Sequence, residues 1–281
     1  MRLDHPRIDY LAIGHVARDI TPQGPLLGGT VAYSGRTALA LGCSVGIVTS
    51  CTSDLDLSPL DGIQIFKLLS EKSTTFNNIY LAGKRSQTIR ATALNLGLAS
   101  VPLQWRQASI IHLAPIADEI DPKIIDQFDS SFIGVTLQGW LRRWDVEGRV
   151  HLNSWKTTKE LLPAVSAVVL SIEDLQGDDD AARDLAKHCA ILAVTRGYKG
   201  VTVFYRGVAD DLPAPAVHEI EETGAGDVFS AAFFKRLQAG STPREAGQFA
   251  NQIPVASVTR IGLQGIPTQV EVLAVGANRK G

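Results

Sequence analysis

The residues best suited to chemistry lie late in the chain, where the sequence runs Gly224-Ala225-Gly226-Asp227. Two glycines allow the backbone to turn sharply and to approach a ligand closely. Apolar residues at helical spacing follow, and Asp227 is a favourable first-turn residue, so we expect a helix over 228–237. The unpaired amides at the start of such a helix, together with its dipole, favour binding of an anion such as phosphate.

A carboxylate beside a bound phosphate can accept the proton of a hydroxyl group. Asp227 and the glycine turn therefore provide the minimum needed for phosphoryl transfer to an alcohol. The same residues also suit a helix start with nothing bound, and the turn alone leaves both interpretations open. The third glycine of a dinucleotide fingerprint is missing after Gly226, and the sequence has no Gly-x-x-x-x-Gly-Lys-Ser/Thr motif.

A second glycine turn, Gly28-Gly29, precedes small residues at helical spacing that end at Gly42, a suitable C-cap. Backbone could approach a ligand here, although small residues also suit close packing of a helix on a sheet. Upstream, Asp19 is expected just past the carboxyl end of a strand at 10–13, where open parallel sheets bind ligands. An ordinary loop aspartate would have the same appearance.

Buried strands and amphipathic helices alternate along most of the chain. This alternation predicts an α/β fold, a mainly parallel sheet with helices on both faces. Strands are predicted at 10–13, 45–48, 109–113, 132–137, 164–170, 190–195 and 201–205, and a further helix at 178–188. One segment interrupts the pattern: residues 74–81 and 86–91 are β-prone and flank a turn at 82–85. This hairpin is either a lid over a ligand or an antiparallel edge.

The composition excludes several classes of protein. The chain has 281 residues and a formal net charge of -2, which gives no electrostatic basis for binding nucleic acid or an anionic membrane. No apolar run approaches the roughly 20 residues needed to span a bilayer. The three cysteines show no metal-ligand spacing and fit reduced thiols, so we expect a cytoplasmic protein without a signal peptide.

Two polar points follow later strands. Glu173 and Asp174 could hold Mg²⁺ through water, or could simply be acids at a helix start. Thr195-Arg196-Gly197-Tyr198-Lys199-Gly200 fits either a nucleotide-binding turn or a hairpin tip. Two basic-aromatic clusters, 140–144 and 155–156, are predicted to form a solvated loop or face rather than a nucleic-acid site.

Taken together, these stretches resemble the PfkB/ribokinase-like carbohydrate kinase family, in order along nearly the whole chain. Residues 224–227 are similar to its carboxy-terminal signature and 28–42 to its amino-terminal signature, while Asp19 and Thr195-x-Gly197-x-x-Gly200 match further motifs. The resemblance implies a ribokinase-like three-layer fold. It also implies one kinase domain over 1–281, with lid segments at approximately 15–27 and 74–97.

The resemblance further implies roles for individual residues. The acceptor alcohol would bind Asp19, Gly28, Gly29 and Tyr33, and Asp227 would accept its proton. The amides of Ala225, Gly226 and Asp227 would stabilise the transferring phosphoryl group. ATP would bind near Thr195, Gly197, Gly200 and Asn251, and Glu173 and Asp174 would serve the Mg²⁺ ion that bridges its phosphates.

The sequence departs from the family pattern at three places. Tyr33 stands where the family usually has an asparagine that helps to bind sugar. Ser171 and Asp174 replace the Asn and Glu of the metal motif. Glu221-Glu222-Thr223 replaces the usual residues before Gly224, which leaves a monovalent-cation site uncertain. Tyr33 and the hairpin sequence are more similar to the inositol-kinase-like branch than to ribokinase itself.

The function expected from the sequence is ATP-dependent phosphorylation of a small polyol, sugar or cyclitol, with a myo-inositol-like acceptor favoured. The alternatives are a nucleoside kinase and a catalytically weak ligand-binding or regulatory protein on the same scaffold. The expected partners are the acceptor and ATP, and the protein is expected to be a monomer or homodimer.

Overall fold

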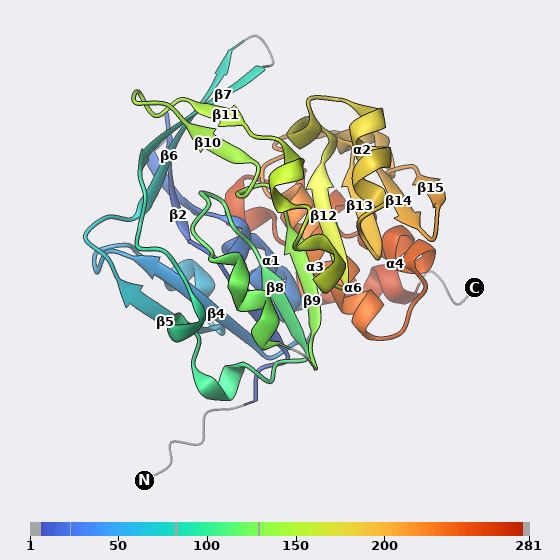
Figure 1. Cartoon of the computed structure of the whole chain (residues 1–281), viewed down its shortest axis with the longest axis horizontal. Coiled ribbons are helices and arrows are strands. Elements are labelled where there is room, and N and C mark those ends of the chain that lie inside the picture. The colour runs from blue at the N-terminus through green and yellow to red at the C-terminus, as the bar shows by residue number, and fades with distance from the viewer. Residues whose placement is uncertain (1–6, 23, 82–83, 129, 278–281) are drawn as a thin grey trace.

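The apolar runs of the chain form a nine-stranded sheet of order β15-β14-β13-β12-β9-β8-β1-β4-β5 (Figure 1). The computed structural model describes residues 7–22, 24–81, 84–128 and 130–277. The strands are β1 (Tyr10–Ile13), β4 (Val45–Cys51), β5 (Gln64–Leu69), β8 (Ile110–Leu113), β9 (Phe132–Thr136), β12 (Ala167–Ser171), β13 (Ile191–Thr195), β14 (Val201–Tyr205) and β15 (Val208–Leu212). All neighbours from β5 to β13 pair parallel, and β14 and β15 complete the sheet in antiparallel pairs.

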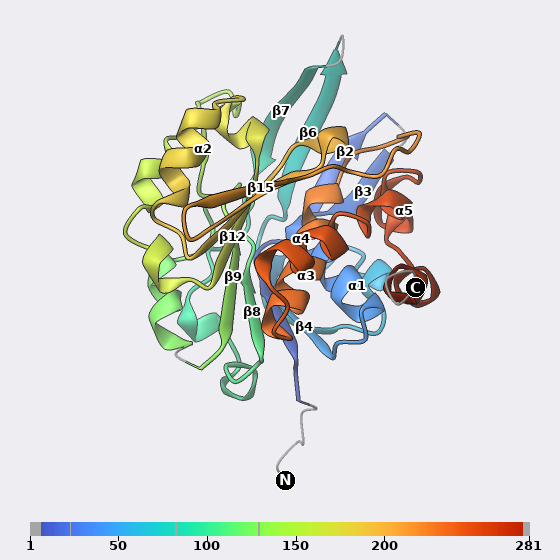
Figure 2. The same ribbon diagram turned by 90° about the vertical axis from the view of Figure 1, so that its right-hand side faces the viewer.

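Helices cover both faces of this sheet, because its central strands are apolar on both sides. Figure 2 shows α1 (Thr30–Ala40), α3 (Ala225–Gln238) and α4 (Pro243–Ala250) on one face and α2 (Asp179–Ala186) on the other. Two separate buried apolar clusters fill these two layers. Two further helices, α5 (Pro254–Ser257) and α6 (Gln269–Ala277), follow α4. Among the described helices, none combines the length and the hydrophobicity that crossing a membrane requires.

A second sheet, here called the lid sheet, has the order β3-β2-β6-β7. Its strands are β2 (Ala17–Thr21), β3 (Gly24–Gly28), β6 (Thr74–Leu81) and β7 (Lys84–Ala91), and Figure 1 shows β6 and β7 extending away from the main sheet. The hairpin expected at 74–91 is therefore present, although its turn residues 82 and 83 lie outside the described residues. Asp19 lies within β2, not in a loop at the edge of the main sheet. The prediction of its local structure was wrong because residues 17–21 continue as a strand after a short break at Gly14–Val16.

Three connections between the main body and the lid sheet meet at one buried residue, His15. Its ring Nε2 donates to the carbonyl of Leu94, 2.8 Å away, and its Nδ1 lies 2.7 Å from the hydroxyl of Thr74. The backbone amide of His15 donates to Glu119, whose buried carboxylate also accepts the amides of residues 116 and 117. Since His15 leaves β1, Thr74 begins β6 and Leu94 follows β7, this cluster fixes the point where the lid sheet joins the body.

A second hairpin, β10 (Arg142–Trp144) and β11 (Val150–Leu152), lies beside β7. The amide of Ile89 in β7 donates to the carbonyl of Gly148 in the hairpin turn, at 2.8 Å. The expectation of a solvated loop here was wrong for Trp140 and Trp155, which are buried in the core on the α2 side. Trp140 donates its indole N–H to the carbonyl of Ile120, so its one polar atom is satisfied in the interior.

Candidate active site

The late glycine turn takes the shape that its sequence predicts. Gly224 has a φ of 83°, in the left-handed region that glycine adopts without strain, and α3 begins at the next residue. The amide of Ala225 donates back to the carbonyl of Glu222 at 3.1 Å, which closes the turn. The first-turn amide of Gly226 belongs to an exposed residue with open space around its Cα atom. An anion at this helix start would therefore be bound mainly by the backbone amides that follow Ala225.

Tyr33 joins the two glycine turns. A Cβ atom at Gly224 would overlap the ring of Tyr33, so the phenol packs directly on this glycine. Tyr33 lies one turn into α1, whose N-cap is Gly29, and it is 4% exposed. Helices α1 and α3 pack against each other along this contact. Residues separated by about two thirds of the chain thus form one site.

Asp19 lies over the first of the early glycines. Its carboxylate occupies the space that a side chain at Gly28 would need, so a larger residue there would displace the carboxylate. At Gly29, with a φ of 93°, a Cβ atom would lie 2.6 Å from the carbonyl oxygen of His15. Close backbone approach therefore requires glycine at Gly29, where the lid sheet meets the start of α1.

A polar relay on the lid sheet orients Asp19. Gln87 of β7 donates to the amide oxygen of Asn78 in β6 at 2.8 Å, and Asn78 donates its own NH₂ group to Asp19 at 3.3 Å. Because one end of the Asn78 amide accepts and the other donates, its orientation follows from Gln87. The inner face of the lid sheet is thus polar at this level. Nearer His15 it is apolar, where Phe76 and Ile89 pack in a small buried cluster.

Arg142 adds a cation at the base of the lid sheet. Its guanidinium lies 5.9 Å from the centre of the Phe76 ring and donates to the carbonyl of Ile116 at 3.4 Å. A cation over an aromatic face is held electrostatically. The sequence did not single out this residue, because nothing nearby in the chain signals that β10 returns beneath the lid sheet.

Asp227 is the third residue of α3 and is half-buried. Its negative charge reaches the core: burial is the main cause that raises the pKa of Tyr10 well above 10, and Cys43 and Asp227 add to the effect. The Tyr10 hydroxyl lies 2.8 Å from Nδ1 of His112, and burial lowers the pKa of His112 to about 3. A neutral, hydrogen-bonded layer therefore lies in the core below α3.

The residues expected to bind the phosphate donor meet at the end of β15. A Cβ atom at Gly200 would overlap the carbonyl of Leu212, and the Asn251 side chain donates to the carbonyls of Leu212 and Pro213, at 3.1 and 2.8 Å. Thr195 ends β13 and donates to the carbonyl of Leu170 at 3.4 Å. Gly197 opens the short helix between β13 and β14. The structure thus places all four expected residues around neighbouring strand ends.

The acids expected to serve Mg²⁺ have a structural use. Asp174 accepts the amide of Ser171 at 3.0 Å, while the Ser171 hydroxyl accepts the amide of Glu173 at 3.2 Å, which is a capping box. Glu173 itself is exposed. Among the described residues, no group of three or more His, Cys, Asp or Glu side chains is placed to hold a metal ion. The role of Glu173 and Asp174 toward Mg²⁺ therefore stays a prediction.

Comparison with known proteins agrees with this geometry. Residues 131–269 match the family described as pfkB family carbohydrate kinase. This range contains β13, β15 and the Gly224 turn. The chain belongs to the pfkB family. As a member of this family it is a sugar or nucleoside kinase, a phosphotransferase with an alcohol group as acceptor.

Several pfkB-family relatives cover much of the chain. A cytidine kinase of Thermococcus kodakarensis is 26% identical over 92% of this chain and 94% of its own. A fructokinase of Escherichia coli is 28% identical over 75% and 72%. An inositol 3-kinase of Zea mays is 29% identical over 53% and 39%.

Solved structures confirm the predicted ribokinase-like fold. A pyrophosphate-dependent kinase in the ribokinase family superposes with a TM-score of 0.80 at 20% identity, covering 95% of this chain and 99% of the other. The ribokinase of Thermotoga maritima superposes with a TM-score of 0.72 at 20% identity, covering 96% and 100%.

Proposed function

We propose that this protein transfers a phosphoryl group from ATP to a hydroxyl of a small polyol, sugar or cyclitol, with a myo-inositol-like acceptor favoured. The observation that carries the proposal is the contact of Tyr33 with Gly224. It supports the proposal because Gly28 and Gly29 precede Tyr33 by five and four residues, and Tyr33 contacts the turn that precedes Asp227.

In this proposal the acceptor lies between the lid sheet and the start of α3. Asp19, oriented by Asn78, accepts hydrogen bonds from acceptor hydroxyls. Asp227 accepts the proton of the attacking hydroxyl, and the amides at the start of α3 stabilise the charge that builds on the transferring group. The phosphate donor enters from the ends of β13 and β15, and Mg²⁺ arrives with ATP as part of that substrate. Closing of the lid sheet excludes water and so limits hydrolysis of the donor.

The polar relay favours a hydroxyl-rich acceptor. Carboxylate and amide groups on the inner face of the lid sheet suit a ligand that offers several O–H donors. The Tyr33 ring is already in contact with Gly224, which narrows the site. The related inositol 3-kinase supports this choice.

A nucleoside acceptor is the second candidate, and the cytidine kinase that spans 92% of the chain is the observation that favours it. The donor also has an alternative, because structural neighbours include pyrophosphate-dependent kinases as well as a fructokinase with bound ATP.

The test measures product formation from Mg²⁺-ATP, and separately from Mg²⁺-pyrophosphate, with myo-inositol, ribose, fructose, cytidine and adenosine as acceptors. Asp227→Asn serves as the control in every assay. Turnover that depends on myo-inositol or a sugar and is lost in the variant supports the proposal. Turnover with a nucleoside alone assigns the second candidate. Binding of an acceptor without turnover from either donor would leave a ligand-binding protein on this scaffold.

A further inference from the structure

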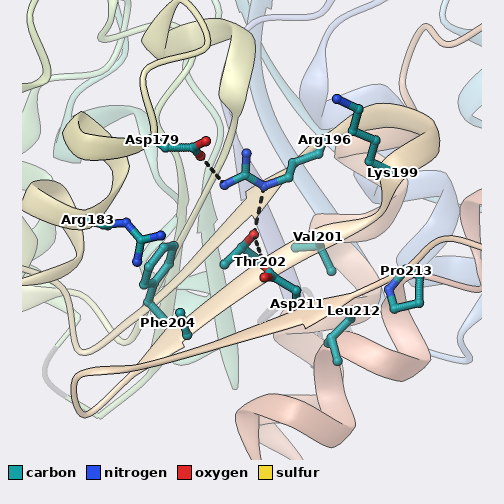
Figure 3. A pocket seen from close by; sticks show the side chains of 11 residues that line it. Asp179, Arg183, Arg196, Lys199, Val201, Thr202, Phe204, Asp211, Leu212 and Pro213 are labelled. Atoms are coloured by element: carbon teal, nitrogen blue, oxygen red, sulfur yellow. Dashed lines mark hydrogen bonds and ion pairs between the residues drawn. The ribbon is translucent and has the colours of Figure 1, made fainter.

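A cavity of about 350 Å³ lies over the last two strands of the main sheet, on the face that carries α2 (Figure 3). It exists because α2 has only eight residues and does not extend across β14 and β15. The proposed active site lies at the start of α3, on the opposite face of the sheet (Figure 2). The cavity is therefore separate from the place where phosphoryl transfer would occur.

Strand alternation sends different side chains to the two faces here. Val203 and Leu212 contact α4, since a Cβ atom at Gly247 would lie 2.8 and 2.7 Å from their methyl groups. Thr202, which pairs directly with Asp211 across the two strands, faces the cavity with it. A sheet face that carries a hydroxyl and a carboxylate is unusual for a surface that only packs against a helix.

These polar groups satisfy one another along the floor of the cavity. Arg196 donates from Nη2 to Asp179 at 2.6 Å and from Nε to the hydroxyl of Thr202 at 2.8 Å. Thr202 in turn donates to Asp211 at 2.6 Å. Figure 3 shows this chain crossing the cavity from α2 to β15. Both carboxylates of the cavity are therefore already engaged.

The remaining charged side chains at the cavity are cations. Arg183 of α2 and Lys199 of the turn before β14 lie on opposite sides of Arg196 (Figure 3), and in the described part of the chain neither forms an ion pair. Three positive side chains thus line the cavity against two negative ones. Phe204 and Ala209 supply an apolar wall between the strands and Arg183.

We propose that this cavity is a regulatory site for a small metabolite that carries a phosphate group. Arg183 and Lys199 bind the phosphate oxygens, for which charge-assisted hydrogen bonds are strong. Arg196, held by Asp179 and Thr202, supplies additional positive charge. The apolar wall accommodates the rest of the metabolite.

Occupation of the cavity also bears on the donor. Arg196 and Lys199 flank Gly197, so a phosphate held by Lys199 restrains the turn from Thr195 to Gly200. This step rests on the proposed role of that turn in donor binding. A bound phosphate is then expected to change the KM for ATP more than it changes kcat.

The test uses inorganic phosphate as the probe and the thermal unfolding of the full chain as the readout, because a ligand of the native state raises Tm. Potassium chloride at equal ionic strength is the reference. A non-hydrolysable ATP analogue in excess keeps phosphate out of the donor site. We expect a saturable rise of Tm, with a half-saturating phosphate concentration that increases about tenfold or more in Arg183→Ala.

The matched control is Arg206→Ala, because Arg206 lies exposed over the Tyr205 ring at 5.0 Å and does not line the cavity. Lys199→Gln is the second variant of the cavity and should act in the same direction as Arg183→Ala. An unchanged half-saturating concentration in both cavity variants would overturn the proposal. So would a rise of Tm that disappears with the ATP analogue, because phosphate would then bind at the donor site only. Catalytic turnover is measured in a separate assay. A Tm response without turnover would refute only the proposed kinase function, and turnover without a Tm response would refute only the proposed phosphate site in the cavity.

Discussion

Replacing Gln87 by glutamate tests the polar relay of the lid sheet with a change of very few atoms. Gln87 now donates to the amide oxygen of Asn78, which leaves the Asn78 NH₂ group facing Asp19. A carboxylate at position 87 accepts only, so the Asn78 amide is expected to turn its NH₂ group toward it. The Asn78 oxygen would then face the Asp19 carboxylate, and the hydrogen bond that orients Asp19 would be lost.

The size of the effect follows from the bond that is lost. Hydrogen bonds to charged groups contribute about 1.5–3 kcal/mol. The Asn78–Asp19 distance of 3.3 Å is long, so the lower end applies. About 1.5 kcal/mol corresponds to roughly a tenfold rise in the KM for the acceptor. Asp227 and the residues at the ends of β13 and β15 that are proposed to bind the donor are unaffected. The kcat and the KM for ATP should therefore change less than about twofold.

The assay is steady-state kinetics with the best acceptor of the panel, varied at saturating ATP and then in reverse. Asn77→Asp is the matched control, because it adds the same charge. Asn77 lies next to Asn78 in β6, so its side chain points to the other face of the sheet. Gln87→Glu should also have no further effect in an Asn78→Ala background. An unchanged acceptor KM, or an equal rise in the control, would refute the reasoning.

Four further predictions concern the site and its supporting core. Asp227→Asn should keep the fold and ATP binding but lower kcat by about 10²-fold or more, since it removes the proton acceptor; wild-type turnover would exclude the assigned role. Asp19→Ala should raise the acceptor KM by tenfold or more and leave the KM for ATP unchanged, and kinetics in which only ATP affinity falls would reverse the two subsites. Gly224→Ala should lower the free energy of unfolding by about 2–4 kcal/mol, because a side chain at φ 83° is strained and would overlap Tyr33, and Tyr33→Ala in the same chain should recover part of it. Burial lowers the pKa of His112 to about 3 from an unfolded value of about 6.5, so the unfolded state binds the extra proton below pH 6.5. Stability should therefore fall by up to about 1.4 kcal/mol per pH unit between pH 6.5 and 3, and urea unfolding of His112→Gln should show a shallower slope.

Much of the fold could be read from local patterns. The strand at 201–205 and the helices at 30–40 and 179–186 are bounded by caps and turns that local chemistry specifies, such as Asp178 accepting the amides of residues 180 and 181. The parallel orientation of the central strands follows from βα alternation. Strand β15 was missed because its sequence, VADDL, is polar for a strand and pairs at an edge.

Some residues of the candidate site could be predicted from the sequence and others could not. Gly29, Gly200 and Gly224 could be found from sequence because a positive φ and a close neighbour together exclude other residues at those positions. The relay from Gln87 to Asp19 could not, because it depends on the register of three strands that belong to distant segments. Trp140 and Trp155 mislead for a related reason. Their basic neighbours suggest a solvated surface, whereas the chain turns the two indoles inward and leaves Arg143 and Lys156 exposed.

In the proposed closing of the lid sheet, the buried cluster at His15 is the hinge about which the sheet rotates. Thr74 sits at the hinge, and Asp19 pairs beside Phe76, two residues along β6. Leu81 ends the strand seven residues from Thr74. At about 3.3 Å per residue, Asp19 lies roughly 7 Å from the pivot and the end of β6 about 23 Å. A rotation that shifts Asp19 by about 1 Å therefore moves the end of the hairpin by roughly 3.5 Å, so a spectroscopic label at that end would amplify acceptor capture into a displacement large enough to follow in real time.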